Sequence, residues 1–120
     1  MKIAISAHGP TTDARVDERF GRATYLLIID PDTDSIVPVD NSVNRDALQA
    51  AGLGAAEIAS EHGVEAVITG HLGPKAYAAL RIAGISGYGG TGLTVAEAVE
   101  RFRAGTLEIL DEGEAHAGMA

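Results

Sequence analysis

Residues 67–76 restrict the fold of this chain more than any other stretch. They read Val-Ile-Thr-Gly-His-Leu-Gly-Pro-Lys-Ala. The apolar start is typical of a buried strand, and Pro74 suits the first turn of a helix, where its missing N–H group would have no partner. The glycine-flanked turn between them aims free backbone N–H groups and the positive end of a helix dipole at one point. The stretch therefore predicts a βα unit whose turn can hold an anion or a cofactor.

Four residues of this turn are candidate site residues. Gly70 and Gly73 let the backbone come close to a ligand. Lys75 adds positive charge, and His71 is the side chain of the turn that can both titrate and ligate a metal ion. A plain βα turn with His71 facing water is the alternative, and the turn alone does not decide between the two.

Composition narrows the fold class and the kinds of ligand. Of the 120 residues, 46% are apolar and only 4% are aromatic, so the core must consist of Ala, Val, Ile and Leu, which favours an α/β layer structure. The net charge of −8 argues against nucleic acid and anionic membranes as partners. The absence of cysteine excludes disulfides, thiolate-bound zinc and ordinary iron–sulfur ligation.

The start of the chain and its hydropathy predict a cytoplasmic protein. Residues 1–5 are a short strand-like run without the apolar region of a signal peptide. No apolar run approaches the ~20 residues that a membrane-spanning helix needs.

Apolar runs, glycines and prolines predict the element order β-β-β-α-β-α-β-α. Strands are expected at residues 2–6, 24–30, 36–40, 65–69 and 85–88, and helices at residues 48–62, 74–83 and 94–104. Pro38 places its strand at an edge of the sheet. Gly52 and Gly54 weaken the start of the first helix, which is expected to be regular only from about Gly54. Thr94 and Glu97 form a capping box.

This order predicts an α/β fold with a mixed five-stranded sheet. Three antiparallel strands followed by right-handed βα crossovers place helices on the faces of such a sheet. We expect residues 1–110 to form a single domain and residues 111–120 to form a disordered acidic tail.

Ligands of such sheets bind outside the carboxyl ends of the parallel strands. That edge should collect several loops: residues 7–22, 41–46, 70–74 and 89–92. These loops contain further candidate site residues, namely His8, Arg22, Asn44, Gly89 and Gly90. Arg19 is a weaker candidate.

Three other functions stay open at this point. A metal-dependent nuclease would need several carboxylates, but residues 2–6 contain no acid and Glu57 would be nearly alone. A nucleotide-binding domain could use Gly52 and Gly54, although a third glycine and a preceding strand are missing. The third alternative is a protein–protein interaction module without a ligand. Enzymatic turnover is not expected, because no nucleophile is paired with a base and there is no thiol.

Several short motifs occur in the order found in a known family. They are Phe20-Gly21-Arg22-Ala23 before a strand, the turn at 70–76, Ala83-Gly84-Ile85, and Thr94-Val95-Ala96-Glu97-Ala98-Val99 leading to Phe102 and Gly105-Thr106-Leu107. Together they resemble the dinitrogenase iron–molybdenum cofactor biosynthesis family. The resemblance runs from residue 1 to about residue 110 and is specific as an ordered set, although each motif alone is weak.

The resemblance implies a ribonuclease-H-like α/β fold that binds or carries a metal–sulfur cluster instead of catalysing a reaction. The orange protein branch of the family, from anaerobic sulfate-reducing bacteria, is similar and carries a molybdenum–copper sulfide cluster without covalent attachment. The expected cofactor is therefore an anionic cluster containing molybdenum, with copper or iron. The expected partners are this inorganic cluster and an acceptor protein.

Relatives in this family often have cysteine where this chain has Leu72, which leaves His71 as the metal-ligating candidate of the motif. Arg22 and Lys75 can neutralise an anionic thiometallate, and backbone N–H groups at the glycines can donate hydrogen bonds to it. The complete set of expected site residues is His71, Gly70, Gly73, Lys75, Arg22, His8, Asn44, Gly89 and Gly90.

Overall fold

The computed structural model describes residues 1–47 and 50–110. The predicted disordered tail at residues 111–120 therefore lies outside the described residues, as do the two residues with which the predicted helix at 48–62 would begin. In the part of the chain that is described, no helix is long and apolar enough to cross a membrane.

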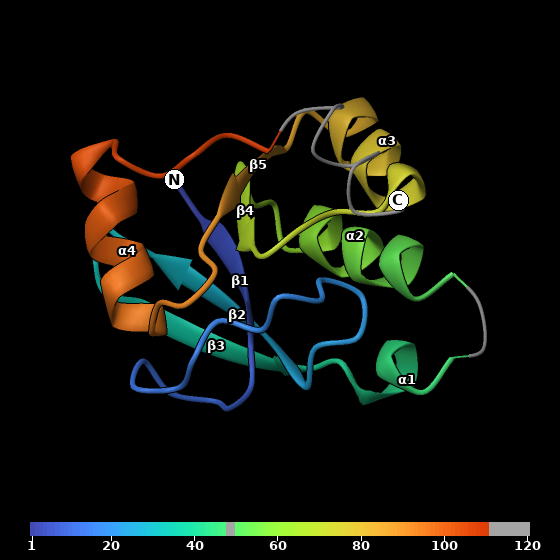
Figure 1. The fold of residues 1–120 in the computed structure, drawn as a ribbon, viewed down its shortest axis with the longest axis horizontal. Helices are drawn as coiled ribbons and strands as arrows, with labels where there is room; N and C mark the ends of the chain where they lie inside the picture. Colours follow the sequence, from blue (N-terminus) through green and yellow to red (C-terminus); the bar gives the residue numbers. More distant parts are fainter. Residues whose placement is uncertain (48–49, 111–120) are drawn as a thin grey trace.

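Five strands form one mixed sheet in the spatial order β3-β2-β1-β4-β5 (Figure 1). They are β1 (Ile3–Ala7), β2 (Tyr25–Asp30), β3 (Ser35–Asp40), β4 (Ala66–Thr69) and β5 (Ser86–Gly89). Strands β1, β2 and β3 pair antiparallel, whereas β4 lies parallel to β1, and β5 lies parallel to β4. The predicted mixed sheet is confirmed, and each strand boundary lies within one residue of its expected position.

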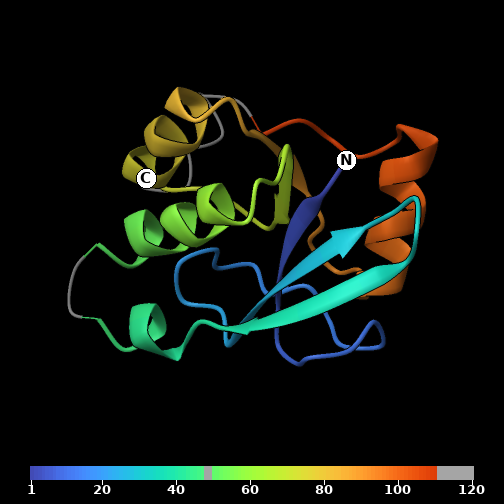
Figure 2. The ribbon, with the colours of Figure 1, turned by 180° about the vertical axis from the view of Figure 1, so that it is seen from behind.

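The two edges of the sheet end differently. Strand β3 forms a hairpin with β2 (Figure 2), and Pro38 lies within this edge strand as predicted. At the other edge, the Gly89 N–H group donates to the carbonyl oxygen of Glu108 at 2.8 Å, and the Leu110 N–H group donates to the carbonyl oxygen of Gly87 at 2.9 Å. The chain around residue 109 therefore covers the outer edge of β5.

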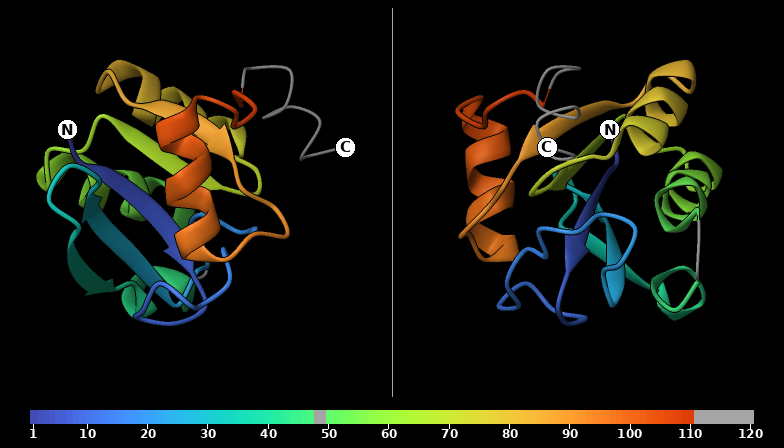
Figure 3. Two further views of the ribbon diagram at one scale, coloured as in Figure 1. Left: turned by 90° about the vertical axis from the view of Figure 1, so that its left-hand side faces the viewer. Right: turned by 45° about the vertical axis from the view of Figure 1, so that its right-hand side comes forward.

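Helices cover both faces of the sheet. The two views of Figure 3 show α2 (Ala51–Glu61) and α3 (Pro74–Ile82) on one face and α4 (Val95–Ala104) on the other. A short helix, α1 (Ser42–Arg45), lies beside α2 and has no counterpart in the predicted order of elements. A single turn is too short to produce an apolar periodicity, which explains why the pattern does not reveal it.

The core consists of two apolar layers, one on each face of the sheet. Because side chains alternate along β2, Leu26 and Ile28 pack with residues of α2 and α3, whereas Leu27 and Ile29 pack with residues of α4. The small side chains of α2 that join the first layer are Ala55, Ala56 and Ala59. They let this helix lie close to the sheet, as the alanine-rich composition predicts.

Helix α2 begins at Ala51, earlier than the regular start expected at Gly54. A Cβ atom on Gly52 would lie 3.0 Å from the Cβ atom of Ala76 in α3. The glycine therefore allows the first turns of α2 and α3 to approach each other closely. Packing between the two helices offsets the low helix propensity of glycine.

The predicted capping box of α4 is confirmed. The Thr94 hydroxyl accepts a hydrogen bond from the Glu97 N–H group at 3.2 Å, and the Glu97 carboxylate accepts one from the Thr94 N–H group at 2.9 Å. The bond from the Thr94 N–H group lowers the pKa of Glu97 from its ordinary value. Gly105 ends the helix with a φ angle of 71°, a conformation that glycine adopts easily.

Candidate functional site

The loops that follow β1, β3, β4 and β5 lie at the same edge of the sheet, because these four strands run in the same direction. The loop after β1 runs along this edge toward the start of α2 (Figures 1 and 2). Three backbone hydrogen bonds join it and its neighbours: His71 N–H to Glu18 O at 3.1 Å, Val16 N–H to Leu93 O at 2.9 Å, and Gly90 N–H to Thr69 O at 2.8 Å. The structure thus brings together the loops expected at the rim.

A groove of about 410 Å³ lies at this rim, between the loop after β1 and the first turns of α2 and α3. The described residues that line it are Arg19, Phe20, Gly21, Arg22, Ala50, Ala51, Gly52, Leu53, His71, Gly73, Pro74, Lys75 and Ala76. Phe20 is buried beneath the groove and joins the core layer under α2 and α3.

The groove is a positive spot on an acidic protein. The chain has 17 Asp and Glu residues against 9 Lys and Arg residues. Among the described lining residues, Arg19, Arg22 and Lys75 carry positive charge, and no side chain is acidic. Such a local excess of cations favours a small anion even though the net charge of the molecule is negative.

Two helices begin at the groove without a side-chain cap. Gly73 precedes α3, and Ala50, with a φ angle of 62°, precedes α2; neither side chain caps its helix, and neither first turn contains an acid. The first N–H groups of a helix have no partner within the helix and carry the positive end of its dipole. The two first turns therefore offer donors to an anion in the groove. Helix α4, away from the groove, has a complete capping box instead.

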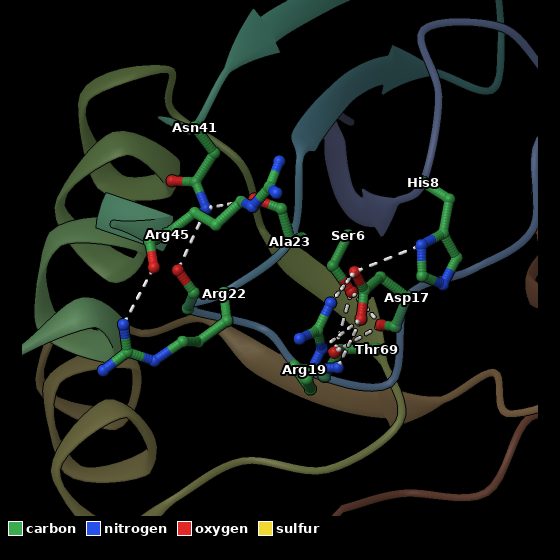
Figure 4. A network of polar contacts seen from close by, with 10 residues as sticks. Ser6, His8, Asp17, Arg19, Arg22, Ala23, Asn41, Arg45 and Thr69 are labelled. Atoms are coloured by element: carbon green, nitrogen blue, oxygen red, sulfur yellow. Dashed lines mark hydrogen bonds and ion pairs between the residues drawn. The ribbon is translucent and has the colours of Figure 1, made fainter. Parts of the chain in front are cut away.

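Arg19 is held in the wall of the groove by the buried carboxylate of Asp17 (Figure 4). Asp17 Oδ1 accepts from the Arg19 backbone N–H at 2.9 Å and from its Nε at 3.2 Å, while Asp17 Oδ2 accepts from Arg19 Nη2 at 3.2 Å. The hydrogen bonds to Asp17, and then its negative charge, raise the pKa of Arg19 above its ordinary value. Arg19 is therefore a fixed cation of the site.

His8 lies outside the groove. Its Nδ1 atom is 3.5 Å from Asp17 Oδ2, and it lines a second hollow of about 360 Å³ together with Arg15 and Arg19. Asp17 thus lies between His8 and Arg19, as Figure 4 shows. Arg19 is a lining residue of both hollows.

Arg22 and Asn44 both hold the segment around α1. Arg22 Nη1 donates to the carbonyl oxygen of Arg45 at 2.8 Å (Figure 4) and to that of Ala47 at 2.6 Å, at the end of α1. Asn44 Nδ2 donates to Oδ1 of the buried Asn41 at 2.8 Å. Arg22 lines the groove while making these bonds, whereas Asn44 does not line it.

Three of the glycines expected at the site lie outside the groove lining: Gly70, Gly89 and Gly90. A Cβ atom on Gly70 would lie 2.5 Å from Cα of Glu18, and one on Gly90 would lie 2.7 Å from Cγ2 of Ile68. Gly89 belongs to β5. Gly70 thus permits close packing against the loop after β1, and Gly90 against β4; this reason for glycine is independent of any ligand. Gly73 lines the groove, and a Cβ atom there would meet nothing within 4 Å.

The side chain of Leu72 points away from the groove. It is 1% exposed and belongs to the core layer beneath α2 and α3, where its Cδ1 atom would lie 2.8 Å from a Cβ atom on Gly87. In the described part of the chain, no group of three or more His, Asp or Glu side chains could hold a metal ion. The groove therefore suits a preformed anion better than a bare metal ion.

Two features at this rim lie outside the expected set of site residues. The first is the start of α2, where Gly52 and Gly54 had suggested a nucleotide site; Gly52 packs against α3, and Gly54 packs against the side chain of Asn44. The second is Asp17, which no local motif distinguishes from the other acids of its loop. The sequence makes Arg19 a weaker candidate, and it does not reveal the contact with Asp17 that fixes the position of this side chain.

Comparison with known proteins identifies the family. Residues 1–105 match the family described as dinitrogenase iron–molybdenum cofactor. The chain belongs to the dinitrogenase iron–molybdenum cofactor family. Membership of this family, indicated by the motifs of the sequence, is thereby confirmed.

Two proteins of solved structure and one further protein, compared by sequence alone, are similar to this chain over nearly its whole length. The apo form of the orange protein from Desulfovibrio gigas is 39% identical, with a TM-score of 0.86, over 90% of this chain and 91% of that chain. A putative NifB protein from Thermotoga is 32% identical, with a TM-score of 0.79, over 90% of this chain and 91% of that chain. An uncharacterised protein of Methanocaldococcus jannaschii is 28% identical over 110 residues, which is 90% of each chain.

Proposed function

We propose that this protein binds an anionic metal–sulfur cluster non-covalently in the groove at the rim of its sheet, and that it carries or helps to assemble this cluster as cargo. One observation supports the proposal above all others. Two helices without side-chain caps and three cationic side chains meet at one groove that has no acidic side chain among its described lining residues. Membership of a family described by an iron–molybdenum cofactor agrees with such cargo.

The residues of the groove make different kinds of interaction with the cluster. Lys75, Arg19 and Arg22 neutralise the negative charge of the cluster, and the first turns of α2 and α3 donate N–H groups to its sulfur atoms. His71 either donates a hydrogen bond or ligates a metal atom at the surface of the cluster. The cluster brings its own sulfide ligands, because the chain contains no cysteine.

We assign the cargo to the molybdenum-containing clusters, of the molybdenum–copper or iron–molybdenum sulfide type, and the partner to an acceptor protein that receives it. The role is that of a binding protein and not of an enzyme. The strand order β3-β2-β1-β4-β5, with helices on both faces, supports a ribonuclease-H-like label for the fold.

The direct test is reconstitution. The apo protein is mixed with tetrathiomolybdate and a copper salt, separated by gel filtration, and analysed for a visible absorption band and for metals. We expect a coloured species that elutes with the protein. Lys75→Glu should lose most of it, whereas Arg101→Glu, which reverses a charge on α4 at the other face of the sheet, should retain it.

Two outcomes would contradict the proposal. If wild-type protein retains neither colour nor metal, the chain acts as an interaction module without cargo. If calorimetry shows saturable binding of ATP or NAD that competes with tetrathiomolybdate, the groove is a nucleotide site instead.

A further inference from the structure

Asp17 is an unusual group to find beside a site for an anion. It is 1% exposed and is the one charged residue among the buried residues of the described chain. A buried carboxylate is costly unless hydrogen bonds and a counter-charge compensate it. Its negative charge also opposes the binding of an anion nearby. A contribution of Asp17 to anion binding would have to offset this repulsion.

The backbone of Asp17 is anchored in the sheet. The Asp17 N–H group donates to the Ser6 carbonyl oxygen at 2.8 Å, and the Asp17 carbonyl oxygen accepts from the Ser6 hydroxyl at 2.7 Å and from the Thr69 hydroxyl at 3.3 Å. Ser6 and Thr69 are buried in the neighbouring strands β1 and β4. The backbone that bears the Asp17 carboxylate is therefore fixed to the sheet.

The side chain of Arg19 is flexible by nature but is fixed here by Asp17. Arg19 is 58% exposed, and a long exposed arginine would otherwise sample many rotamers. Asp17 takes the Nε and Nη2 donors of the guanidinium. Of the five N–H donors of an arginine side chain, those on Nη1 and one on Nη2 remain for another acceptor. Arg19 borders the groove with these donors uncommitted to Asp17.

We propose that Asp17 is a positioning residue, which holds the guanidinium of Arg19 in the groove wall before the cargo binds. The remaining N–H donors of Arg19 can then meet the anionic cargo without a further loss of rotamer freedom on binding. The inference rests on the proposed function of the groove. It predicts a change in affinity on substitution of Asp17 that is opposite in sign to the change expected from charge alone. Asp17→Asn removes a negative charge from the neighbourhood of an anion, which by charge alone should tighten binding.

The first experiment measures the affinity for tetrathiomolybdate. We expect Asp17→Asn to weaken binding by about three- to tenfold, the usual cost of ordering a long side chain on binding. Arg19→Lys should weaken it similarly, because lysine keeps the charge but lacks the planar fork. Unchanged or tighter binding by Asp17→Asn would overturn the proposal.

A double-mutant cycle separates positioning from a general loss of structure. In an Arg19→Ala background, Asp17→Asn should no longer weaken binding, because the side chain that it positions is absent. If Asp17→Asn weakens binding equally in both backgrounds, Asp17 supports the fold and does not act through Arg19.

A third measurement uses the apo wild-type protein alone, so it needs neither cargo nor a variant that folds. In the apo protein, the Nε–H group of Arg19 should give a sharp NMR signal that exchanges slowly with water, because Asp17 accepts from it. Rapid exchange in the wild-type protein would overturn the proposal even if Asp17→Asn fails to fold. If wild-type protein does not bind tetrathiomolybdate but this signal is protected, the proposed function fails while the contact between Asp17 and Arg19 stands.

Discussion

A Cβ atom on Gly21 would lie 2.7 Å from the Cα atom of Gly52 and 2.5 Å from the carbonyl carbon of Ala51. Backbone therefore lies directly against backbone where the loop after β1 meets the first turn of α2. Both glycines line the groove. The contact thus joins two of its walls, and no side chain fits between them.

We predict that Gly21→Ala destabilises the protein. The added methyl group must push the loop away from α2, which should lower the free energy of unfolding by about 1–3 kcal/mol, the usual cost of overpacking. Urea unfolding measures this change. Gly89→Ala is the matched control, because its Cβ atom would meet nothing closer than Leu110 Cδ2 at 3.6 Å. Its free energy of unfolding should change by no more than about 0.5 kcal/mol; equal losses in both variants would refute the packing argument.

His71 can be tested against another histidine of the chain. His71 lines the groove, whereas His62 lies at the end of α2 away from it. We expect His71→Ala to reduce the amount of thiomolybdate–copper species retained after gel filtration by about tenfold, on the scale of one hydrogen bond to a charged group. His62→Ala should retain the wild-type amount. Equal retention by both variants would remove His71 from the site.

A cysteine at position 72 should not create a metal ligand. Because Leu72 is buried in the core, Leu72→Cys should place its thiol there, lower the free energy of unfolding by about 1–3 kcal/mol and leave cluster retention unchanged. The matched variant is Gly73→Cys, whose side chain has open space at the groove. A thiol reagent should modify native Gly73→Cys rapidly and native Leu72→Cys slowly. Fast modification of Leu72→Cys would show that position 72 faces the groove.

The capping box of α4 predicts a dependence of stability on pH. The hydrogen bond from the Thr94 N–H group lowers the pKa of Glu97 in the folded state, so the ionised carboxylate stabilises the fold. This contribution is complete above the ordinary pKa of glutamate and is lost as pH falls through the lowered pKa. The wild-type protein should therefore lose its stability advantage over Glu97→Gln between about pH 5 and pH 2. Unfolding curves of both proteins across this range test it, and a difference independent of pH would contradict it.

Local chemistry allowed much of the fold to be predicted from the sequence. Pro74 marks the start of α3, Thr94 and Glu97 mark the start of α4, and Pro38 marks an edge strand, because each acts through its own backbone or its near neighbours. The short helix α1 escaped prediction because a single turn leaves no apolar periodicity, and the Arg22 side chain that holds its end is distant in the sequence.

The candidate site was harder to predict, because the sequence does not show whether a glycine lines a binding groove or allows two backbone segments to pack closely. Gly73 faces the groove, whereas Gly70 accommodates the backbone of Glu18. A side chain has open space at Gly73 and no room at Gly70, and only the spatial neighbours distinguish the two positions. The pairing of Asp17 with Arg19 is likewise invisible in the sequence, since an acid two residues from an arginine in a polar loop is ordinary.

Under the proposed function, the absence of side-chain caps on α2 and α3 would tie the lifetime of the protein to its cargo. An anion that binds the folded form alone, at about a hundredfold excess over its dissociation constant, raises the stability of the fold by roughly 2.7 kcal/mol. Under the proposed function, the carrier without cargo therefore unfolds more often and is cleaved by proteases sooner than the loaded carrier. Degradation would then remove carriers without cargo preferentially, so that the supply of cluster would itself set the amount of protein.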